Sequence, residues 1–420
     1  MKHFFLIALA LVFFSSCKRD FEAPVPGNDW PLFLSAPVTR LPSFTRNNIE
    51  GIYSINDGSI LFGNQSAFKW SYTKTSADTV FNLSVFSPLD AIYIILEGRR
   101  LNNDILLNGY WRRNVNVETG KVRLTITAAN GATALLNNTT ADSIIINGVY
   151  GNADATPDIP LAFKYLRPLR NNAGFEILAH RGGGRNADLL PASENSLEML
   201  RLAASFGATG VEIDVRQTKE GELILYHDAT LNERLIVKNG MVGPIENYSY
   251  AQLNALVQLS RGGKIPTLRQ ALQTILLQTP LRFVWLDTKY EGSLQNLRAL
   301  QQEFIQAAIA NGRQLQIFIG IPTEKVLNEF VKLPANQNIP SLSELDVPKT
   351  ESINAKIWAP TWTGGLQTEQ VNKMQAQGRN VFTWTLDGPD RIEKFLKEGS
   401  FNGILSNQPS AVAFYFYAKQ

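Results

Sequence analysis

Residues 176–215 read EILAHRGGGRNADLLPASENSLEMLRLAASFGATGVEIDV, and their hydrophobic pattern changes twice. The short apolar run at Glu176–Ala179 is typical of a buried strand, and Val211–Val215 repeats it. Between them, Ser196–Phe206 has the apolar spacing of an amphipathic helix, which ends at Gly207. A strand, a helix and a second strand in so short a stretch indicate an α/β fold built on parallel strands.

The same alternation continues toward the end of the chain. The apolar runs that look like strands are Glu176–Ala179, Val211–Val215, Leu223–Tyr226, Phe283–Leu286, Leu315–Ile321, Ile357–Ala359, Val381–Thr385 and Gly403–Leu405. The predicted helices after the first are Leu268–Leu277, Leu294–Ala310, Thr323–Val331, Glu369–Gln377 and Asp390–Glu398. This pattern predicts a TIM (β/α)₈ barrel, although residues 332–356 are ambiguous and a doubly wound sheet is also compatible with it.

The region from residue 46 to residue 170 has the sequence pattern of β-strands. Val122, Leu124 and Ile126 alternate with polar residues, as in a half-buried strand, and Asn130-Gly131 is one of several turn signals. We predict an all-β sandwich or small barrel domain of six to nine strands, without a catalytic constellation of its own. The predicted organisation is a signal peptide at 1–17, a proline-rich linker at 18–45, the β domain at 46–170 and the α/β domain at 171–420.

Composition excludes several classes of protein. The chain has 420 residues, of which 44% are hydrophobic, so it can bury the cores of two domains and is not globally disordered. Its 40 basic and 37 acidic residues leave a net charge of +3, which argues against a nucleic-acid partner. A single cysteine excludes a disulfide framework and a cysteine zinc site, and three histidines exclude a histidine-rich metal centre.

The single cysteine stands at the end of a signal-like segment. Lys2 precedes an apolar run at Phe4–Phe14, which is too short to span a membrane, and small residues lead to Cys17. The segment resembles a bacterial lipoprotein signal, which implies cleavage before Cys17 and lipidation of its thiol. We therefore expect a lipid-anchored protein of the bacterial cell envelope, with the outer membrane favoured because Lys18 follows the cysteine. Plain secretion with an incidental cysteine is the alternative.

The histidines outside the signal segment both follow predicted strands. His180 follows the first strand and His227 the third, which is where a barrel of this kind carries its active site. Two histidines with pKa values near neutrality can supply the acid and the base of one reaction. Two unrelated histidines that happen to end strands would give the same pattern.

Three carboxylates also lie at strand ends. Glu212 and Asp214 are two residues apart, so they point to the same side of a strand, and Asp287 follows the fourth strand. A cluster of oxygen ligands without cysteine suits Ca²⁺ or Mg²⁺ rather than zinc. A network of these acids with Arg181 and Lys289, without any metal, is the alternative.

The same strand ends carry groups that bind anions. Gly182-Gly183-Gly184 can bring backbone N–H groups close to an anion, Arg181 can bind a phosphate through two hydrogen bonds, and Lys289 adds a point charge. Two acid/base groups, a divalent cation and anion-binding cations together fit metal-assisted cleavage of a phosphodiester.

The order of these motifs resembles that of the glycerophosphodiester phosphodiesterase family over roughly residues 174–410. The matching motifs are His180-Arg181-Gly182, Glu194-Asn195-Ser196, Glu212-Ile213-Asp214, Thr218-Lys219-Glu220-Gly221, His227-Asp228, Asp287-Thr288-Lys289 and Trp384-Thr385. The resemblance implies a TIM barrel that hydrolyses glycerophosphodiesters to glycerol phosphate and an alcohol. It implies an acid/base pair (His180, His227), metal ligands (Glu212, Asp214, Asp287) and phosphate-contacting residues (Arg181, Lys289). Glu194 would orient Arg181, and Trp384 would be either an apolar wall for the glycerol or barrel packing.

Some positions depart from the family pattern. Asp287 stands where glutamate is more frequent, Ser196 replaces threonine, Thr385-Leu386-Asp387 lacks an asparagine after Trp-Thr, and Ser406-Asn407 replaces Thr-Asp. None of these changes removes an acid, a base or a metal ligand, so they bear on substrate preference more than on activity.

Two other functions remain open from the sequence. One is a phospholipase D-like enzyme acting on lysophospholipids, which a membrane tether would favour. The other is a non-catalytic surface-binding lipoprotein, which would have been supported by loss of a histidine or a carboxylate. Since no serine or cysteine has an activating partner in a motif, we expect the substrate's own glycerol hydroxyl to attack first, giving a cyclic phosphate.

The predicted lipid anchor can be tested by cell fractionation. We expect Cys17→Ala to move the protein from the membrane fraction to the soluble fraction, because the remaining chain has no other predicted anchor. Membrane retention of the variant after a high-salt wash would contradict the lipoprotein prediction.

Overall fold

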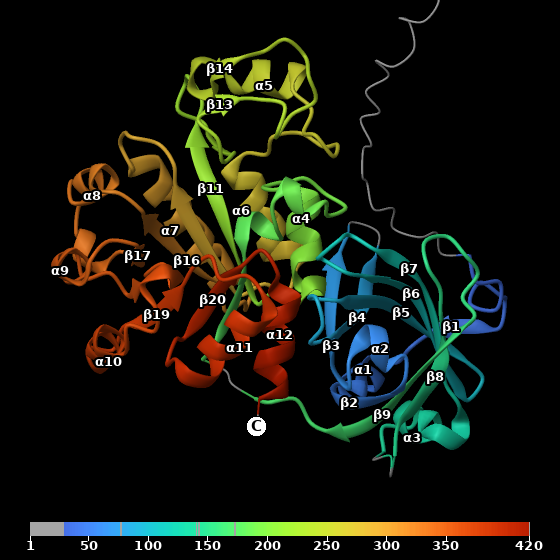
Figure 1. Cartoon of the computed structure of the whole chain (residues 1–420). Coiled ribbons are helices and arrows are strands. Elements are labelled where there is room, and N and C mark those ends of the chain that lie inside the picture. The colour runs from blue at the N-terminus through green and yellow to red at the C-terminus, as the bar shows by residue number, and fades with distance from the viewer. Residues whose placement is uncertain (1–28, 76–77, 140, 142, 172–173, 420) are drawn as a thin grey trace, which may run out of the picture.

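The computed structural model describes residues 29–75, 78–139, 141, 143–171 and 174–419. The predicted signal segment, Cys17 and the first part of the linker lie outside these residues. The described chain forms two β-barrels that lie against each other (Figure 1). Within it, no helix combines the length and the apolar character needed to cross a membrane.

The first barrel is antiparallel. Its strands are β1 (Val38–Arg40), β2 (Gly51–Asp57), β3 (Gln65–Lys74), β4 (Thr79–Phe86), β5 (Tyr93–Leu101), β6 (Asp104–Arg112), β7 (Thr119–Ile126), β8 (Ile145–Tyr150) and β9 (Ile159–Arg167). From β2 onward each strand pairs with the next, and β9 returns to pair with β2, which closes the barrel; β1 pairs with the end of β5. The predicted β domain is therefore a small barrel and not a sandwich.

Apolar side chains fill the inside of this barrel. Alternate residues of the strands point inward, so Ile94 and Leu96 of β5 are buried among Phe68, Leu107 and Val122 from other strands. The short helices α1 (Ser43–Ile49), α2 (Ser59–Phe62) and α3 (Ala132–Leu136) add buried residues to the same core. The intervening residues of β5, Tyr93 and Ile95, face outward and pack against the second barrel.

The second barrel is parallel. Its strands are β10 (Glu176–Ala179), β11 (Gly210–Gln217), β15 (Phe283–Thr288), β16 (Gln316–Ile321), β17 (Ser341–Ser343), β18 (Ile357–Trp358), β19 (Asn380–Thr383) and β20 (Gly403–Ser406). Each pairs in parallel with its neighbours, and β10 pairs with both β11 and β20, which closes the barrel. This closure confirms the predicted TIM barrel and excludes the doubly wound sheet.

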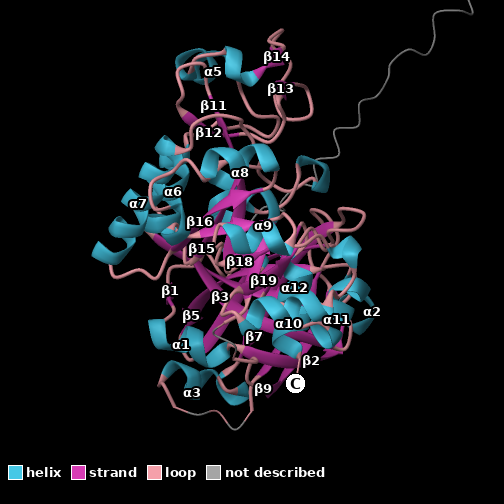
Figure 2. Cartoon of the chain, turned by 90° about the vertical axis from the view of Figure 1, so that its left-hand side faces the viewer, coloured by secondary structure: helices cyan, strands magenta, loops and turns pink. Residues whose placement is uncertain are grey.

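Helices surround these strands, as Figure 2 shows from the side. They are α4 (Leu197–Leu202), α6 (Leu268–Gln278), α7 (Gln295–Ala310), α8 (Glu324–Phe330), α9 (Val347–Ser352), α10 (Thr368–Ala376), α11 (Pro389–Glu398) and α12 (Pro409–Ala418). Local capping fixes several of their starts: the Ser196 hydroxyl accepts a hydrogen bond from Met199 N at the start of α4, and Thr267 with Gln270 forms a capping box at α6.

One strand assignment made from sequence was wrong, and one barrel strand was not identified. The run at Leu223–Tyr226 is not a barrel strand: β12 (Leu223–Leu225) folds back antiparallel on the end of β11 after a turn at Gly221. The missing barrel strand is β17, which lies in the ambiguous region 332–356 and carries two serines among its three residues. Apolar content identifies a strand without giving its direction, and so short and polar a strand has no visible pattern.

The segment after β12 forms an insert above the mouth of the second barrel (Figure 1). It contains β13 (Thr230–Leu231), β14 (Gly243–Pro244) and α5 (Tyr250–Leu256), and its buried residues, such as Ile236 and Leu253, form a separate small core. The insert therefore carries the residues after β12 over the carboxyl ends of the barrel strands.

The two barrels share one apolar core. Tyr93 and Phe86 of the first barrel belong to the same buried cluster as Phe206 and α12 of the second, and the rings of Tyr93 and Phe206 have centroids 5.3 Å apart. The Ser84 hydroxyl also donates to the Ser205 carbonyl at 2.7 Å across the contact. Such a buried contact fixes the orientation of one barrel relative to the other.

Candidate active site

His180 lies in the tight turn that follows β10, mostly buried at the barrel mouth. Its Nδ1 is 2.7 Å from Asn407 Oδ1, and Asn407 Nδ2 in turn donates to Asp387 Oδ2 at 2.6 Å. This orientation of the amide makes Nδ1 the protonated ring nitrogen and leaves Nε2 facing Glu212 Oε2 at 3.8 Å. Burial and then the nearby Arg181 lower the pKa of His180 to about 4, so the ring is neutral at pH 7.

Asp387 and Asn407 explain two departures from the family pattern. Asp387 occupies the position where the pattern has asparagine, and Asn407 the position where it has aspartate. The two side chains contact each other in the structure, and Asp387 Oδ1 also accepts from Asn407 N at 2.8 Å. The acid and the amide of these two segments thus support each other, and an uncharged amide oxygen contacts His180.

His227 reaches the site from the insert side. It follows β12, so the prediction that it ends a barrel strand was wrong, although it does lie over the barrel mouth. Its Nδ1 is 2.7 Å from Asp228 Oδ1, and Asp228 is held by Arg234 at 2.7 Å. Burial would raise the pKa of Asp228, but hydrogen bonds from Arg234 and His227 outweigh it and keep the pKa below its usual value. The ionised Asp228 can therefore fix the orientation of the imidazole.

The predicted carboxylates come together on adjacent strands. Glu212 and Asp214 point inward from β11, Asp287 points inward from β15, and Asp214 and Asp287 are paired in register. One oxygen of each lies within 4.8 Å of the others. Burial and the neighbouring Asp214 and Asp287 raise the pKa of Glu212 well above its usual value.

This cluster fits a divalent cation. One oxygen on each side chain (Glu212 Oε1, Asp214 Oδ1, Asp287 Oδ1) is buried and accepts no hydrogen bond from the residues that the structure describes. Buried carboxylate oxygens are costly without a compensating charge, and a hard cation satisfies several at once. The residues present could therefore hold a metal ion such as Ca²⁺ or Mg²⁺.

Lys289 and Arg181 supply positive charge to the same cluster. Lys289 Nζ is 2.5 Å from Asp287 Oδ2 and 3.5 Å from Asp214 Oδ1. The Arg181 backbone N–H donates to Glu212 Oε2 at 2.8 Å, and its Nε lies 3.8 Å from Asp214 Oδ2. The ion pairs of the metal-free alternative are thus present, but they leave one oxygen of each carboxylate without a hydrogen bond.

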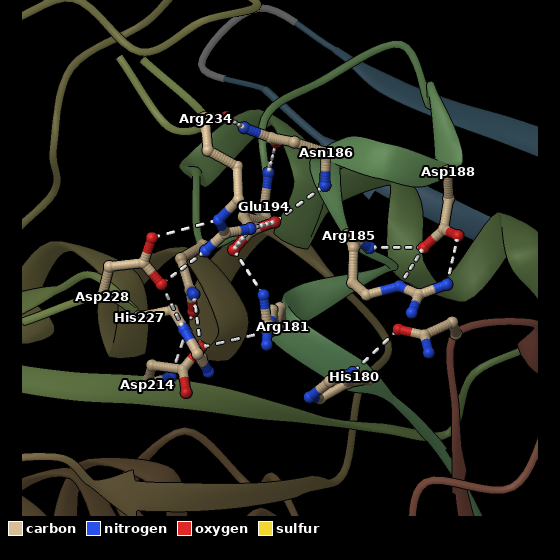
Figure 3. Close-up of polar contacts among 12 residues, drawn as sticks. His180, Arg181, Arg185, Asn186, Asp188, Glu194, Asp214, His227, Asp228 and Arg234 are labelled. Atoms are coloured by element: carbon tan, nitrogen blue, oxygen red, sulfur yellow. Dashed lines mark hydrogen bonds and ion pairs between the residues drawn. The ribbon is translucent and has the colours of Figure 1, made fainter. Parts of the chain in front are cut away.

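Glu194 holds Arg181 in place. Figure 3 shows this carboxylate between Arg181 and Arg234, whose Nη1 atoms lie 2.8 Å and 3.0 Å from Glu194 oxygens. Asn186 N also donates to Glu194 at 2.7 Å, so the carboxylate is saturated by protein donors. Glu194 is 2% exposed, which makes it a support for Arg181 and not a group that reaches substrate directly.

Trp384 follows β19 and packs on the aromatic cluster inside the barrel. Its Nε1 donates to the Ala359 carbonyl at 2.8 Å, which anchors the indole beside Phe382. These contacts explain a tryptophan at this position by its packing inside the barrel. Its contact with the glycerol stays a prediction.

Several site residues had no role assigned from the sequence. Asn195 exchanges hydrogen bonds with Asp214, at 2.7 Å and 3.1 Å. Glu344 follows β17 two residues after the inward-pointing Leu342, so it faces the same side, and its Oε1 is buried without a partner among the described residues. Burial and nearby Asp287 raise the pKa of Glu344 well above its usual value. Asn195 was visible within its motif, whereas Glu344 follows a strand that sequence pattern did not reveal.

Comparison with known families agrees with this geometry. A sequence model of the glycerophosphoryl diester phosphodiesterase family matches residues 180–411, which is more than half of the chain. The chain belongs to this family. The match covers every predicted catalytic, metal and phosphate-contacting residue of the second barrel and none of the first barrel. The resemblance identified from the motifs is therefore confirmed, and the chain is a phosphoric diester hydrolase.

Individual relatives carry the same description. A glycerophosphodiester phosphodiesterase of Caldanaerobacter subterraneus is 22% identical over 242 residues, which are 56% of this chain and 95% of that protein. Glycerophosphodiester phosphodiesterase 1 of Homo sapiens is 30% identical over 149 residues, 34% of this chain and 42% of that protein. Among solved structures, a glycerophosphodiester phosphodiesterase from Parabacteroides distasonis has 22% identity and a TM-score of 0.46, covering 58% of this chain and 96% of its own.

The carboxylate cluster predicts a measurable metal affinity. We expect Asp287→Ala to weaken binding of Ca²⁺ or Mg²⁺ at least about tenfold, the lower range even for residues that only support ligands, and Asp287→Glu to weaken it less. Isothermal titration calorimetry measures both, with the exposed Asp158→Ala in the first barrel as the control. Equal affinities in the wild type and Asp287→Ala would favour the metal-free ion-pair network.

Proposed function

We propose that the protein hydrolyses glycerophosphodiesters to glycerol phosphate and an alcohol, with His180 and His227 as the acid/base pair. The observation that carries this proposal is the convergence of both histidines, three buried carboxylates and Arg181 at one barrel mouth. Burial would raise the pKa of Asp214, but the positive charge of Lys289 and then of His227 lowers it below its usual value. His180 contributes in the same direction, so both histidines lie close to Asp214. Because each histidine is oriented by a different side chain, one can accept a proton while the other donates a proton in the cleavage of one phosphodiester.

The supports of the two rings favour distinct roles. His180 is neutral at pH 7, with Nε2 as the unprotonated nitrogen, so it can accept a proton from an attacking hydroxyl. His227, oriented by Asp228, would then protonate the oxygen of the leaving alcohol. In the second step, in which water hydrolyses the intermediate, the two histidines would exchange these roles.

Arg181 and Lys289 would bind the phosphate. Arg181 Nη1 is fixed by Glu194, while its buried Nε has no hydrogen-bond partner among the described residues and remains able to donate. Lys289 extends from the end of β15 over Asp287. A guanidinium held by a second residue loses little side-chain entropy when it binds an anion.

Glu212, Asp214 and Asp287 would hold Ca²⁺ or Mg²⁺. A divalent cation in that position would supply charge stabilisation to the oxygens of the reacting phosphate. The remaining chemistry depends on residues of the chain and on the substrate itself.

The first nucleophile in this proposal is the free glycerol hydroxyl next to the phosphoester. Its own carbon chain holds it beside phosphorus, which gives a high effective molarity, and His180 would remove its proton. The product is a five-membered cyclic phosphate and the free alcohol. Water activated by a histidine then opens the ring to glycerol phosphate.

A second candidate substrate class is lysophospholipid, which would be cut in the phospholipase D manner. The observation that favours it is a group of exposed apolar residues on the insert above the barrel mouth: Val237, Val242 and Leu256, at 46%, 72% and 60% exposure. They could contact an acyl chain or a lipid surface, to which the predicted anchor at Cys17 would bring the enzyme. Comparing turnover of glycerophosphocholine, glycerophosphoethanolamine and lysophosphatidylcholine, each with Ca²⁺ or Mg²⁺, separates the two classes.

The acid/base assignment predicts a characteristic pattern of losses. We expect His180→Ala and His227→Ala each to lower kcat at least about 10²-fold, the lower range for this type of catalysis. The double variant should be little worse than the worse single variant, because both residues act in one reaction. Steady-state kinetics with circular dichroism as a folding control tests this, and near-normal turnover in a folded single variant would remove that histidine from the mechanism.

The nature of the nucleophile can be tested with a modified substrate. We expect a glycerophosphodiester whose hydroxyl next to the phosphoester is replaced by hydrogen to bind but to be hydrolysed at least about 10²-fold more slowly, since the internal nucleophile is lost. The ratio of kcat values for the two substrates is the measurement. Comparable rates would show direct attack by water.

A further inference from the structure

The outer face of the first barrel reaches a loop of the active site. Arg112 ends β6 on the same outward face as Tyr110, and it is only 1% exposed. Its Nη2 donates to the carbonyl of Leu189 at 2.5 Å and to that of Asp188 at 3.3 Å. Both carbonyls belong to the loop 183–195, which connects the turn of His180 to α4 in the second barrel.

The buried guanidinium of Arg112 donates its hydrogen bonds to backbone carbonyls instead of to a carboxylate. Within the described part of the chain no carboxylate forms an ion pair with Arg112, although Asp188 itself lies nearby and pairs with Arg185 at 2.9 Å. Burying a charge is costly unless its donors find acceptors, so this contact is selective for the two carbonyls in their observed positions.

The part of the loop that Arg112 contacts has an unfavourable backbone conformation at Leu189. Leu189 has φ 52° and ψ 35°, a left-handed conformation that is unfavourable for a branched side chain. The next residue, Leu190, is 2% exposed and lies in the apolar core that the two barrels share. The carbonyl of Leu189 is therefore held by the first barrel, and Leu190 beside it is anchored in the core that joins the two barrels.

Hydrogen bonds link Asp188, next to Leu189, with the segment that holds Arg181, and Figure 3 shows those between Asp188 and Arg181. Asp188 Oδ2 accepts from Arg185 N at 2.7 Å, which closes a tight turn around Asn186. Asn186 and Glu194 exchange two hydrogen bonds, of 2.7 Å and 2.8 Å, and Glu194 binds Arg181 at 2.8 Å. Each of these hydrogen bonds is short and at least partly buried, so a shift at Leu189 has a direct route to Arg181.

We propose that the first barrel is a functional part of the active site, in which Arg112 is a positioning residue that holds the loop 183–195 and through it the Glu194–Arg181 pair. The inference rests on the proposed role of Arg181 in binding the substrate phosphate. The three carboxylates of the candidate metal site lie on strands β11 and β15, and the loop reaches them through Asn195 at its far end, which exchanges hydrogen bonds with Asp214. Arg112 therefore acts more on phosphate binding than on the metal site.

The test compares three variants of the full-length protein. Arg112→Met removes the two hydrogen bonds and keeps most of the apolar volume, and Arg112→Lys keeps a charge and a donor. Arg113→Met is the matched control, because the adjacent Arg113 pairs with Glu118 at 3.0 Å and Asp90 at 3.6 Å and forms no ion pair with the described residues of the loop.

We expect Arg112→Met to raise KM for glycerophosphocholine about tenfold or more with a small change in kcat, because phosphate binding is lost in ground and transition states alike. Arg112→Lys should recover part of this loss, and Arg113→Met should behave as the wild type. Ca²⁺ or Mg²⁺ affinity should fall by a smaller factor than KM rises. In hydrogen exchange, the amides of residues 183–195 should exchange faster in Arg112→Met while those of β15 stay protected.

Two results would overturn the proposal. One is a folded Arg112→Met variant with wild-type KM and wild-type exchange in residues 183–195. The other is a loss of metal affinity as large as the rise in KM, together with a loss of β15 protection, which would make Arg112 a general stabilising residue. If the wild type hydrolyses no glycerophosphodiester, the proposed function fails, and the exchange measurement still decides whether Arg112 holds the loop.

Discussion

The burial of three carboxylates at the ends of two adjacent strands is the constraint on which the rest of the site depends. Glu212 and Asp214 share a face of β11, and Asp287 lies beside Asp214 on β15, with each residue at most 7% exposed. Like charges at this distance in a poorly solvated place require compensation. Lys289, the Arg181 backbone N–H and the Asn195 amide supply part of it, and the oxygens that remain unsatisfied form the candidate cation site.

Those compensating groups determine the shape of the surrounding loops. The Arg181 N–H can reach Glu212 because Arg181 itself has a positive φ of 52° in the turn after β10. Asn195 can reach Asp214 because Ser196 caps α4 directly after it. Glu194, between Arg181 and Arg234, joins the turn after β10 to the insert that carries His227. The acidic cluster, both histidine loops and the insert thus form one connected polar network.

The sequence could predict those parts of this arrangement that depend on local periodicity. Alternation along β11 placed Glu212 and Asp214 on one side, and strand–helix alternation identified the barrel and most of its helices. The errors had physical causes. Leu223–Leu225 is as apolar as a barrel strand, and only its pairing with β11 shows that it runs antiparallel. Ser341–Ser343 is too short and too polar to show a period, so Glu344 after it had no predicted place.

The sequence by itself determined the family and the set of acids, bases and cations, and it favoured the parallel barrel over a doubly wound sheet, because these follow from residue type and from the spacing of residues and motifs along the chain. Only the tertiary structure decided that the β domain is a closed barrel, that Asn407 and Asp387 support His180, and that Arg112 contacts the loop of Arg181. These contacts join residues that are tens to hundreds of positions apart. Their partners are selected by how the two barrels pack, and no periodicity within one segment records that packing.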